Sequence, residues 1–421
     1  MANILYLVHR LPYPPNKGDK VRSYHLLKHL AAQHRVFLGT FIDDPEDEPY
    51  LDTVKALCAD AFVVALQPRL ARLASLGALV TGDALTLRYY QHAGLQRWVS
   101  DTVASAALDM AVVFSSAMAP YLAAHADLPV LLDLVDVDSA KWTAYADARR
   151  WPLSWLYRRE GQRLLAFERA AVQRSVRSFL VTQKEVDLFL GLAPDAVGRI
   201  EVSGNGVDAD YFVPSAARVT PYQATELPLV FTGAMDYWPN VDAVCWFVAE
   251  VLPTLRSRWP HLRLHVVGRN PSGAVQALAS EAVSVTGTVP DVRPYLQHAA
   301  VVVAPLRLAR GVQNKVLEAM AMARPVVTAT TCALALTATV GRDLLVADEP
   351  ADYAEAISRL LQSPALAAEL GAAARRCVLD QYSWPARLAS LNRWLHQQLP
   401  PESPAAPAAA QAYQHLQQEP A

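Results

Sequence analysis

Thirteen short apolar runs of β-type residues recur along the chain, and longer segments with a helical spacing of apolar residues separate them. The runs are apolar on both faces, which is typical of strands in a parallel sheet that helices cover on both sides. The sequence therefore predicts an α/β fold built from βαβ units. The runs lie at residues 4–8, 36–42, 61–66, 110–114, 129–135, 178–182, 200–203, 227–233, 262–268, 283–287, 301–305, 325–330 and 344–347.

Thirteen strands are too many for one open sheet, and the pattern restarts midway. Residues 206–226 lack helical or alternating periodicity and predict a crossing between domains. We expect one doubly wound domain at 1–205 and a second at 227–375, with a C-terminal helix region at 376–398 that packs back toward the first domain. The Pro/Ala/Gln tail at 399–421 should be disordered. Ligands of such sheets bind at the carboxyl ends of the strands, here in a cleft that both domains face.

Composition narrows the functional classes. Hydrophobic residues make up 52% of the 421 residues, and the formal net charge of −2 argues against a general nucleic-acid binder. The four cysteines form no CxxC pair, so neither a zinc site nor a disulfide framework is indicated. Residues 1–10 lack the features of a signal peptide, and no apolar run is long enough to span a membrane. We expect a cytoplasmic protein and leave peripheral attachment to a membrane open.

The stretch ARGVQNKVLEAMAMARPVV, residues 309–327, joins a cationic loop to an amphipathic helix. We expect the helix to begin near Gly311, where unpaired N–H groups, Arg310 and Lys315 would form a site for an anion such as phosphate. Glu318 could accept two hydrogen bonds from a hydroxylated group such as a ribose. The alternative is a solvated face with a Lys315–Glu318 ion pair. Five apolar residues predict the buried stripe of this helix: Val312, Val316, Leu317, Met320 and Ala323.

The first domain offers a glycine loop after its first strand. The proline-rich segment 9–17 delivers Gly18 directly before a helix, at the carboxyl end of the strand. Gly18 could let the backbone approach a ligand, and Lys17, Lys20 or Arg22 could meet a negative charge. The alternative is a glycine that is needed only for a positive φ.

Three carboxylates, Asp133, Asp136 and Asp138, alternate at the end of the run 129–135. Asp136 could act as a base or orient an acceptor hydroxyl, whereas Asp138 or Ser139 could cap the next helix. We do not expect a metal, because alternation along a strand sends Asp136 and Asp138 to the face opposite that of Asp133, and no phosphate loop of the GxxxxGK[ST] type accompanies them.

Residues 149–177 are basic and aromatic. The segment contains eight arginines, and Trp151, Trp155 and Tyr157 lie among the first four of them. Arginine interleaved with Trp and Tyr is typical of a helix that rests on anionic lipid headgroups or grips a lipid-linked diphosphate. The alternative is a long helix with its aromatic residues in the core and its arginines solvated.

Six segments are informative in their order and spacing: the loop with Gly18, NGVD at 205–208, LVFTGAMDYWPNVDA at 229–243, HVVGRNP at 265–271, VTGTVPDVRPYL at 285–296 and KVLEAMAMARPVV at 315–327. They resemble the retaining glycosyltransferases of family 4, which have the GT-B fold of two Rossmann-like domains facing a central cleft. The resemblance covers nearly the whole chain, to about Trp394. The chain is also similar to a subgroup associated with exosortase/PEP-CTERM systems, whose genes accompany exopolysaccharide synthesis. Three stretches carry this similarity: VDVDSAKW, TGAMDYWPNVDAVCWF and APLRLARGVQNKVLEAMAMARPVV.

The resemblance implies that a sugar is transferred from a nucleotide diphosphate sugar, with retention at the anomeric carbon and without an essential metal or a further cofactor. Glu318 matches the ribose-binding glutamate of the family, the segment Val289–Arg293 would lie near the base, and the diphosphate would meet Gly311 and Val312. The expected donor-binding residues are Gly18, Gly233, Val289, Arg293, Arg307, Gly311, Val312, Asn314 and Glu318.

The sequence also departs from the family pattern. Arg310 stands where the family commonly has a second glutamate. Ala234 and Asn240 stand at about the places of an arginine and a lysine. We infer that Arg307, Arg310 and Lys315 supply the missing positive charge.

We therefore predict a cytoplasmic glycosyltransferase that acts on a glycan or polyprenyl-diphosphate-linked acceptor in exopolysaccharide synthesis. Its catalytic residues would be Asp136, Arg310 and Lys315. The segment 149–177 could contact the inner membrane. Two alternatives remain: a non-catalytic binding or scaffold subunit, motivated by the missing cations, and a nucleotide-sugar epimerase.

Overall fold

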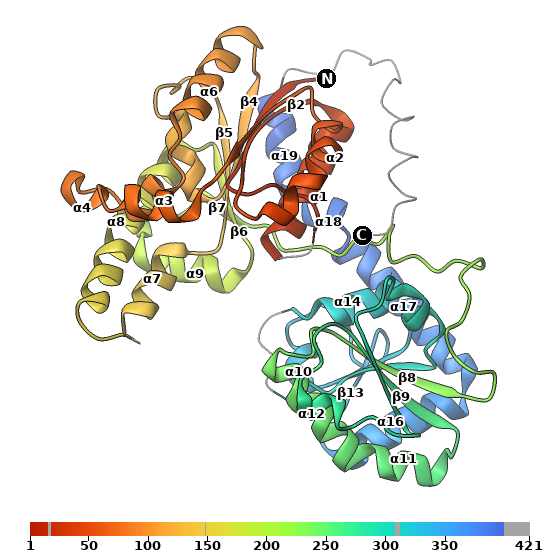
Figure 1. Cartoon of the computed structure of the whole chain (residues 1–421). Helices are drawn as coiled ribbons and strands as arrows, with labels where there is room; N and C mark the ends of the chain where they lie inside the picture. Colours follow the sequence, from red (N-terminus) through yellow and green to blue (C-terminus); the bar gives the residue numbers. More distant parts are fainter. Residues whose placement is uncertain (16–17, 148, 308–311, 400–421) are drawn as a thin grey trace. The chain divides into compact units, whose positions relative to one another are not determined.

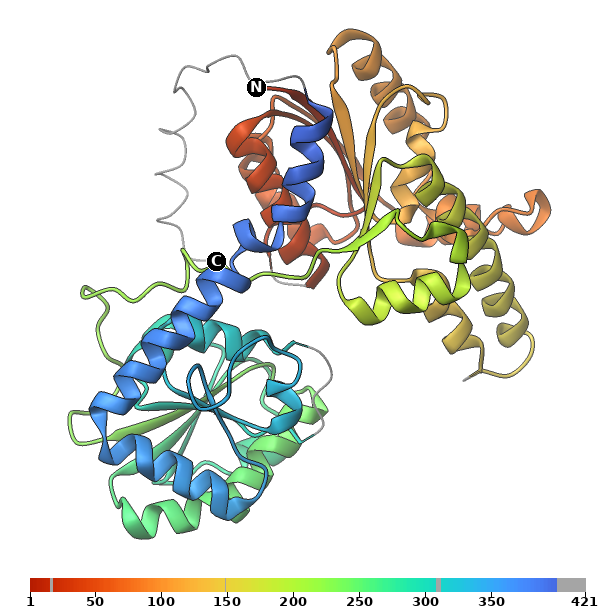
Figure 2. The same ribbon diagram turned by 180° about the vertical axis from the view of Figure 1, so that it is seen from behind.

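The computed structural model describes residues 1–15, 18–147, 149–307 and 312–399. The chain divides into two compact units (Figures 1 and 2). The described residues of Met1–Asn205 and of 387–399 form the first unit, and those of Gly206–Ala386 form the second. Arg310 and Gly311, both predicted site residues, lie outside the described residues, as does all of the predicted tail except Leu399.

The first unit contains a parallel sheet of seven strands in the order β3-β2-β1-β4-β5-β6-β7. The strands are β1 (Asn3–Val8), β2 (Arg35–Ile42), β3 (Asp60–Ala65), β4 (Met110–Phe114), β5 (Val130–Val135), β6 (Arg177–Leu180) and β7 (Ile200–Val202). The helices are α1 (Gly18–Gln33), η1 (Pro45–Tyr50), α2 (Leu51–Lys55), α3 (Pro68–Ser75), α4 (Ala78–Thr81), α5 (Leu85–Tyr89), α6 (Ala93–Ser105), η2 (Ser116–Leu122), α7 (Asp138–Asp147), α8 (Leu153–Arg174), α9 (Gln183–Leu192) and η3 (Pro194–Ala196).

The second unit repeats this plan with six parallel strands in the order β10-β9-β8-β11-β12-β13. The strands are β8 (Leu227–Thr232), β9 (Leu262–Val267), β10 (Val283–Gly287), β11 (Val301–Ala304), β12 (Val326–Thr328) and β13 (Leu345–Val346). The helices are α10 (Trp238–Trp246), η4 (Phe247–Val251), α11 (Leu252–Arg258), α12 (Gly273–Gln276), α13 (Arg293–His298), α14 (Asn314–Ala321), α15 (Thr330–Ala333), α16 (Pro350–Gln362) and α17 (Pro364–Gln381).

The chain returns to the first unit through two short helices. They are α18 (Trp384–Arg387) and α19 (Ala389–Gln398). Helix α19 is held beside β7, where Glu201 accepts hydrogen bonds from Trp394 Nε1 at 3.0 Å and from Arg393 Nη2 at 2.8 Å. The chain therefore crosses between the units twice, once after Asn205 and once at α18.

The α/β prediction is confirmed, because each of the thirteen apolar runs contains a strand. Both sheets are doubly wound: the strand order runs outward from β1 in one direction and then restarts on its other side with β4, as it does with β8 and β11. The loops after the two strands at such a reversal point diverge, and ligands bind in the crevice that they leave. In the second unit, those loops follow β8 and β11.

Candidate functional site

Two glycines shape the crevice end of the second sheet. Gly233 follows β8 with a φ of +150°, and Gly268 follows β9 with a φ of +154°. A Cβ on Gly268 would lie 1.7 Å from the carbonyl oxygen of Gly233, so the two loops touch backbone to backbone. A Cβ on Gly233 would lie 2.8 Å from Asn240 Nδ2 and 2.9 Å from Lys315 Nζ. Glycine at 233 therefore leaves room for the polar groups that gather there.

Helix α14 brings Lys315 and Glu318 to this place, but it begins at Asn314 rather than near Gly311. The residue before it, Gln313, is extended, with φ −96° and ψ 108°. Val312 consequently lies outside the helix and is 38% exposed, which corrects the prediction that it joins the buried stripe. Ala323 also lies beyond the helix, at a positive φ of 54°, whereas Val316, Leu317 and Met320 are buried as predicted.

Helix α17 fixes the other end of α14. A Cβ on Gly371 would lie 2.2 Å from the carbonyl oxygen of Ala323, so α17 packs without an intervening side chain against the turn that follows α14. Arg375 donates hydrogen bonds to the carbonyl oxygens of Ala321 and Phe212. A cation at the last carbonyls of a helix stabilises it through the helix dipole. The polar N-terminal turn of α14 therefore stands on a rigid support.

Lys315 places its ammonium group beside Gly233, at the carboxyl end of β8. Its Nζ donates to Asn240 Oδ1 at 2.5 Å and lies 4.2 Å from the centroid of the Phe231 ring. Burial lowers the pKa of Lys315 to about 8, against the opposing effect of Glu318. Asn240 in turn donates from Nδ2 to the carbonyl oxygen of Ala234 at 2.8 Å, so one amide joins the β8 loop to the lysine.

Glu318 lies one turn further along the same face. No hydrogen bond to its carboxyl group is present within the described part of the chain, and Lys315 is the charged group that acts on it. Burial raises the pKa of Glu318 to about 7. A half-buried carboxyl group without a donor has its acceptor capacity available for the hydroxyl groups of a ligand.

Arg307 lies just after β11, at the other side of the reversal point. Its guanidinium forms a bidentate ion pair with Asp242 of α10, with distances of 2.7 and 3.3 Å, and lies 5.4 Å from the centroid of the Trp246 ring. The side chain is 46% exposed, so part of its positive charge faces solvent. Asn314 is exposed at the first position of α14.

Val289 lies in the loop after β10, and Arg293 is the first residue of α13. Arg293 pairs with Asp291 at 2.9 Å, and its guanidinium stacks 3.9 Å from the centroid of the Tyr211 ring. Val289 is half-buried against the apolar core of the unit. No contact joins either residue to Lys315 or Glu318 in the described part of the chain.

Sequence reasoning found Gly233, Lys315 and Glu318 but missed three of their neighbours. Asn240 was noted only as the replacement of a lysine. Phe231 lies inside an apolar strand, where nothing distinguishes it from a core residue. The role of Gly268 depends on its contact with Gly233, which lies in a different loop, so the sequence alone does not reveal it.

The first unit corrects the predictions made for Lys20 and Arg22. Both side chains are buried and paired with carboxylates of the same unit: Lys20 Nζ lies 2.5 Å from Asp47, and Arg22 Nε lies 2.8 Å from Asp133. Each of these buried cations is already neutralised by its carboxylate partner, so neither is placed to meet the negative charge of a ligand. Gly18 is the first residue of α1, and Lys17 lies outside the described residues.

Asp136 follows β5, directly after Val135, whose φ is +68°. Its carboxylate and that of Asp138 share Lys141, whose Nζ lies 2.8 and 3.1 Å from them. The two carboxylates raise the pKa of Lys141. The predicted cap is corrected, because α7 already begins at Asp138, so neither Asp138 nor Ser139 precedes it. The amides of Val137 and Ser139 donate instead to Glu185 and Glu168. Long-range carboxylates therefore replace the local cap.

The aromatic residues of the segment 149–177 are not all in the core. Trp151 is 80% exposed and Trp155 is 55% exposed, whereas Tyr157 is half-buried. For the two tryptophans, this contradicts the alternative of a helix that buries its aromatic residues. No helix in the described ranges is both long and apolar enough to cross a bilayer.

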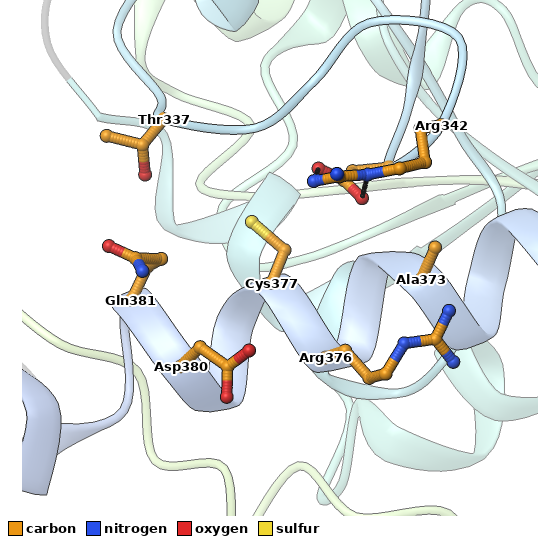
Figure 3. A pocket seen from close by; sticks show the side chains of 8 residues that line it. Thr337, Arg342, Ala373, Arg376, Cys377, Asp380 and Gln381 are labelled. Atoms are coloured by element: carbon orange, nitrogen blue, oxygen red, sulfur yellow. Dashed lines mark hydrogen bonds and ion pairs between the residues drawn. The ribbon is translucent and has the colours of Figure 1, made fainter.

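A hollow of about 460 Å³ lies elsewhere on the second unit, between α17 and the loop 337–343 (Figure 3). Two of the residues that line it form an ion pair, with 2.8 Å between Arg342 Nη2 and Asp343 Oδ2. Its residues include both charge signs and none of the predicted site residues: Thr337, Arg342, Asp343, Ala373, Arg376, Cys377, Asp380 and Gln381. The chemistry of Lys315 and Glu318 makes the β8/β11 crevice the better candidate.

The sequence and the fold were compared with known proteins. Residues 226–363, from just before β8 into the turn after α16, match the family Glycosyl transferases group 1. No curated protein sequence matches the chain. Among solved structures, sucrose-phosphate synthase from Thermosynechococcus elongatus is similar at 17% identity and a TM-score of 0.59, over 94% of this chain and 99% of that one.

Two further solved structures resemble the chain. HepE of Anabaena in complex with UDP-glucose covers 94% of this chain and 100% of its own, at 16% identity and a TM-score of 0.57. WaaG, a glycosyltransferase involved in lipopolysaccharide biosynthesis, covers 93% of this chain and 99% of its own, at 17% identity and a TM-score of 0.58. The chain therefore has the GT-B fold of two Rossmann-like α/β domains.

Proposed function

We propose that this protein is a glycosyltransferase whose second unit binds a nucleotide diphosphate sugar at the carboxyl ends of β8 and β11. The observation that carries this proposal is Glu318, whose carboxyl group has no hydrogen-bond donor among the described residues and lies next to Lys315 at the start of α14. Glu318 would accept hydrogen bonds from the two ribose hydroxyls. Lys315, Arg307 and the first amides of α14 would meet the diphosphate.

The demanding step is departure of the diphosphate, since negative charge builds on the leaving oxygen as the anomeric carbon becomes oxocarbenium-like. Lys315 can stabilise that charge without reorganisation, because Asn240 and Phe231 already hold its ammonium group in place. Losing one such preorganised donor typically costs about 10²–10³ in rate. We extend this role to Arg310, which lies outside the described residues.

On the first unit, we propose that Asp136 orients the acceptor hydroxyl. Its position after β5, in an exposed ion pair with Lys141, leaves the carboxylate reachable from solvent. We further propose a glycan or polyprenyl-diphosphate-linked acceptor, retention at the anomeric carbon, independence of metal, a cytoplasmic location and a role in exopolysaccharide synthesis. These proposals rest on the resemblance of the sequence motifs.

Donor binding is the first test. UDP, GDP and ADP, each free and linked to a sugar, would be titrated against the protein by calorimetry. HepE binds UDP-glucose, so the uridine series comes first. Lys315→Met should weaken binding of the preferred nucleotide at least tenfold, because it removes a charge-assisted contact. Lys55→Met, an exposed lysine on α2, is the matched control. Equal affinities for the two variants would place the donor elsewhere.

Turnover then separates three activities. The preferred nucleotide sugar would be incubated with a membrane lipid extract. Nucleotide release that needs the extract, together with a glycosylated lipid, supports transfer. Conversion of the donor into its epimer without the extract supports an epimerase. Tight binding without any conversion supports a scaffold subunit and would refute the proposed activity.

A further inference from the structure

Helices α3 and α4 expose their apolar side. Four large apolar side chains recur at spacings of three, three and four residues and form one stripe: Leu70 (59% exposed), Leu73 (65%), Leu76 (47%) and Val80 (92%). The positions that face the protein are small, namely Ser75 and Ala78, and both are buried. A surface helix normally shows the opposite arrangement, with its leucines inside. We call these four residues the outer stripe.

The outer stripe belongs to a segment that is firmly attached to α8. Arg159 donates from Nη2 to the carbonyl oxygen of Ala78 at 2.7 Å and from Nη1 to that of Asp83 at 3.1 Å. The fully buried Glu160 accepts hydrogen bonds from the amides of Leu85 and Thr86 at 2.6 and 2.8 Å. Figures 1 and 2 show α3 and α4 at the margin of the first unit. The attached side of the segment is therefore fixed, and its leucines point outward.

The neighbouring helix extends the apolar surface. Trp155 is 55% exposed and lies four residues before Arg159, so the two side chains share one face of α8. Because Arg159 contacts α4, Trp155 lies about one helical turn, ~5 Å, from that contact. Trp151, at 80% exposure, and Leu153, at 45%, precede it at the start of the helix.

The charge of this surface is positive. Residues 66–82 contain no Asp or Glu, and Arg69 and Arg72 are exposed on α3. Arg149 and Arg150 are exposed beside Trp151. None of these four arginine side chains has an ion-pair partner in the described part of the chain. Apolar side chains flanked by unpaired arginines match the boundary between acyl chains and anionic headgroups.

We propose that the outer stripe, with Arg69 and Arg72, docks the first unit onto the surface of an anionic lipid bilayer, with Trp155 at its edge. A second copy of the chain is a poorer occupant, because a symmetric contact would bring these arginines toward their own counterparts. An anionic bilayer satisfies the leucines and the arginines together. The inference is independent of the donor site and of the proposed transfer reaction.

The test is flotation of the full-length protein with vesicles, without any nucleotide sugar. One set contains equal parts of phosphatidylcholine and phosphatidylglycerol, and the other contains phosphatidylcholine alone. The wild type should float with the anionic set only. Leu73→Gln combined with Val80→Gln should weaken binding at least tenfold. Arg69→Gln with Arg72→Gln should weaken it about fivefold for each arginine and reduce its salt dependence.

The matched control is Leu188→Gln with Val197→Gln, two exposed apolar residues on another part of the same unit. This variant should bind like the wild type. All substituted side chains are exposed, so circular dichroism should show an unchanged fold. The proposal is overturned if the wild type does not float with anionic vesicles, or if the stripe variants bind them as well as the control does. Ultracentrifugation that shows a dimer dependent on Leu73 and Val80, without vesicle binding, would assign the stripe to a second copy and equally refute the proposal.

Discussion

Replacing Glu318 with glutamine should make the free protein more stable while weakening the binding of donor. Burial raises the pKa of this carboxyl from 4.5 to about 7. Once the group is ionised in both the folded and the unfolded state, such a rise corresponds to about 3 kcal/mol of lost stability. Residual solvent contact screens part of this, and losing the attraction to Lys315 offsets another part. We expect Glu318→Gln to gain about 1–2 kcal/mol at pH 8.

The gain in the free energy of unfolding from Glu318→Gln should depend on pH. Because the folded pKa is raised, the contribution of Glu318 to stability is complete below pH 4.5 and is lost as the pH rises through about 7. The glutamine variant cannot ionise, so it should match the wild type near pH 4 and exceed it at pH 8. Urea unfolding at several pH values measures the difference directly. Glu369→Gln, at an exposed position on α17, should show no such divergence.

Donor binding should move the opposite way. A neutral amide offers one acceptor oxygen in place of a carboxylate, so hydrogen bonds from a ribose lose their charge assistance, about 1–2 kcal/mol or roughly 5- to 30-fold in affinity. Opposite signs for stability and binding are expected of a residue kept for its ligand rather than for packing. If Glu318→Gln destabilises the protein at pH 8, or binds donor like the wild type, the reasoning about this carboxyl is refuted.

Three further predictions follow from the same geometry. Gly233→Ala should lower the free energy of unfolding by about 1–3 kcal/mol and weaken donor binding, because its Cβ would enter the space of the lysine ammonium, whereas Gly191→Ala, with open space around it, should do neither. Arg22→Met should cost about 3–5 kcal/mol in urea unfolding, because Asp133 would remain buried without its partner. Donor affinity, measured by calorimetry across pH, should rise through about pH 7 as the carboxyl of α14 ionises and fall above about pH 8 as Lys315 loses its proton; a flat profile would contradict both assignments.

Much of the fold could be predicted because its signal is local. A run that is apolar on both faces marks a covered parallel strand, and this rule located every strand, even the two-residue β13. Element ends were harder. Val312 fits a helical stripe by spacing, yet it precedes the helix, since Gln313 adopts an extended backbone. Spacing describes which residues share a face and does not say where the helix starts.

The same limit explains α3. Leu70, Leu73 and Leu76 repeat like the buried side of an ordinary surface helix, and the sequence contains no sign that they face outward. Orientation depends on how the helices that follow α3 are held: Arg159 of α8 donates to the carbonyl oxygen of Ala78 in α4, and the buried Glu160 of α8 accepts from the amide of Leu85 in α5. Those residues lie about 80 positions further along the chain, so the contact is invisible to any local pattern.

The crevice also gives a physical account of why this chain can lack a lysine at position 240. Asn240 donates to the carbonyl oxygen of Ala234 and accepts from Lys315. An ammonium group at 240 could not accept that hydrogen bond, and it would lie beside Lys315, where two like charges at low dielectric repel strongly. Asn240 is neutral and offers an acceptor, so it holds the ammonium group of Lys315 without repelling it. α14 thus brings positive charge next to Gly233, where the amide of Asn240 holds the ammonium group of Lys315.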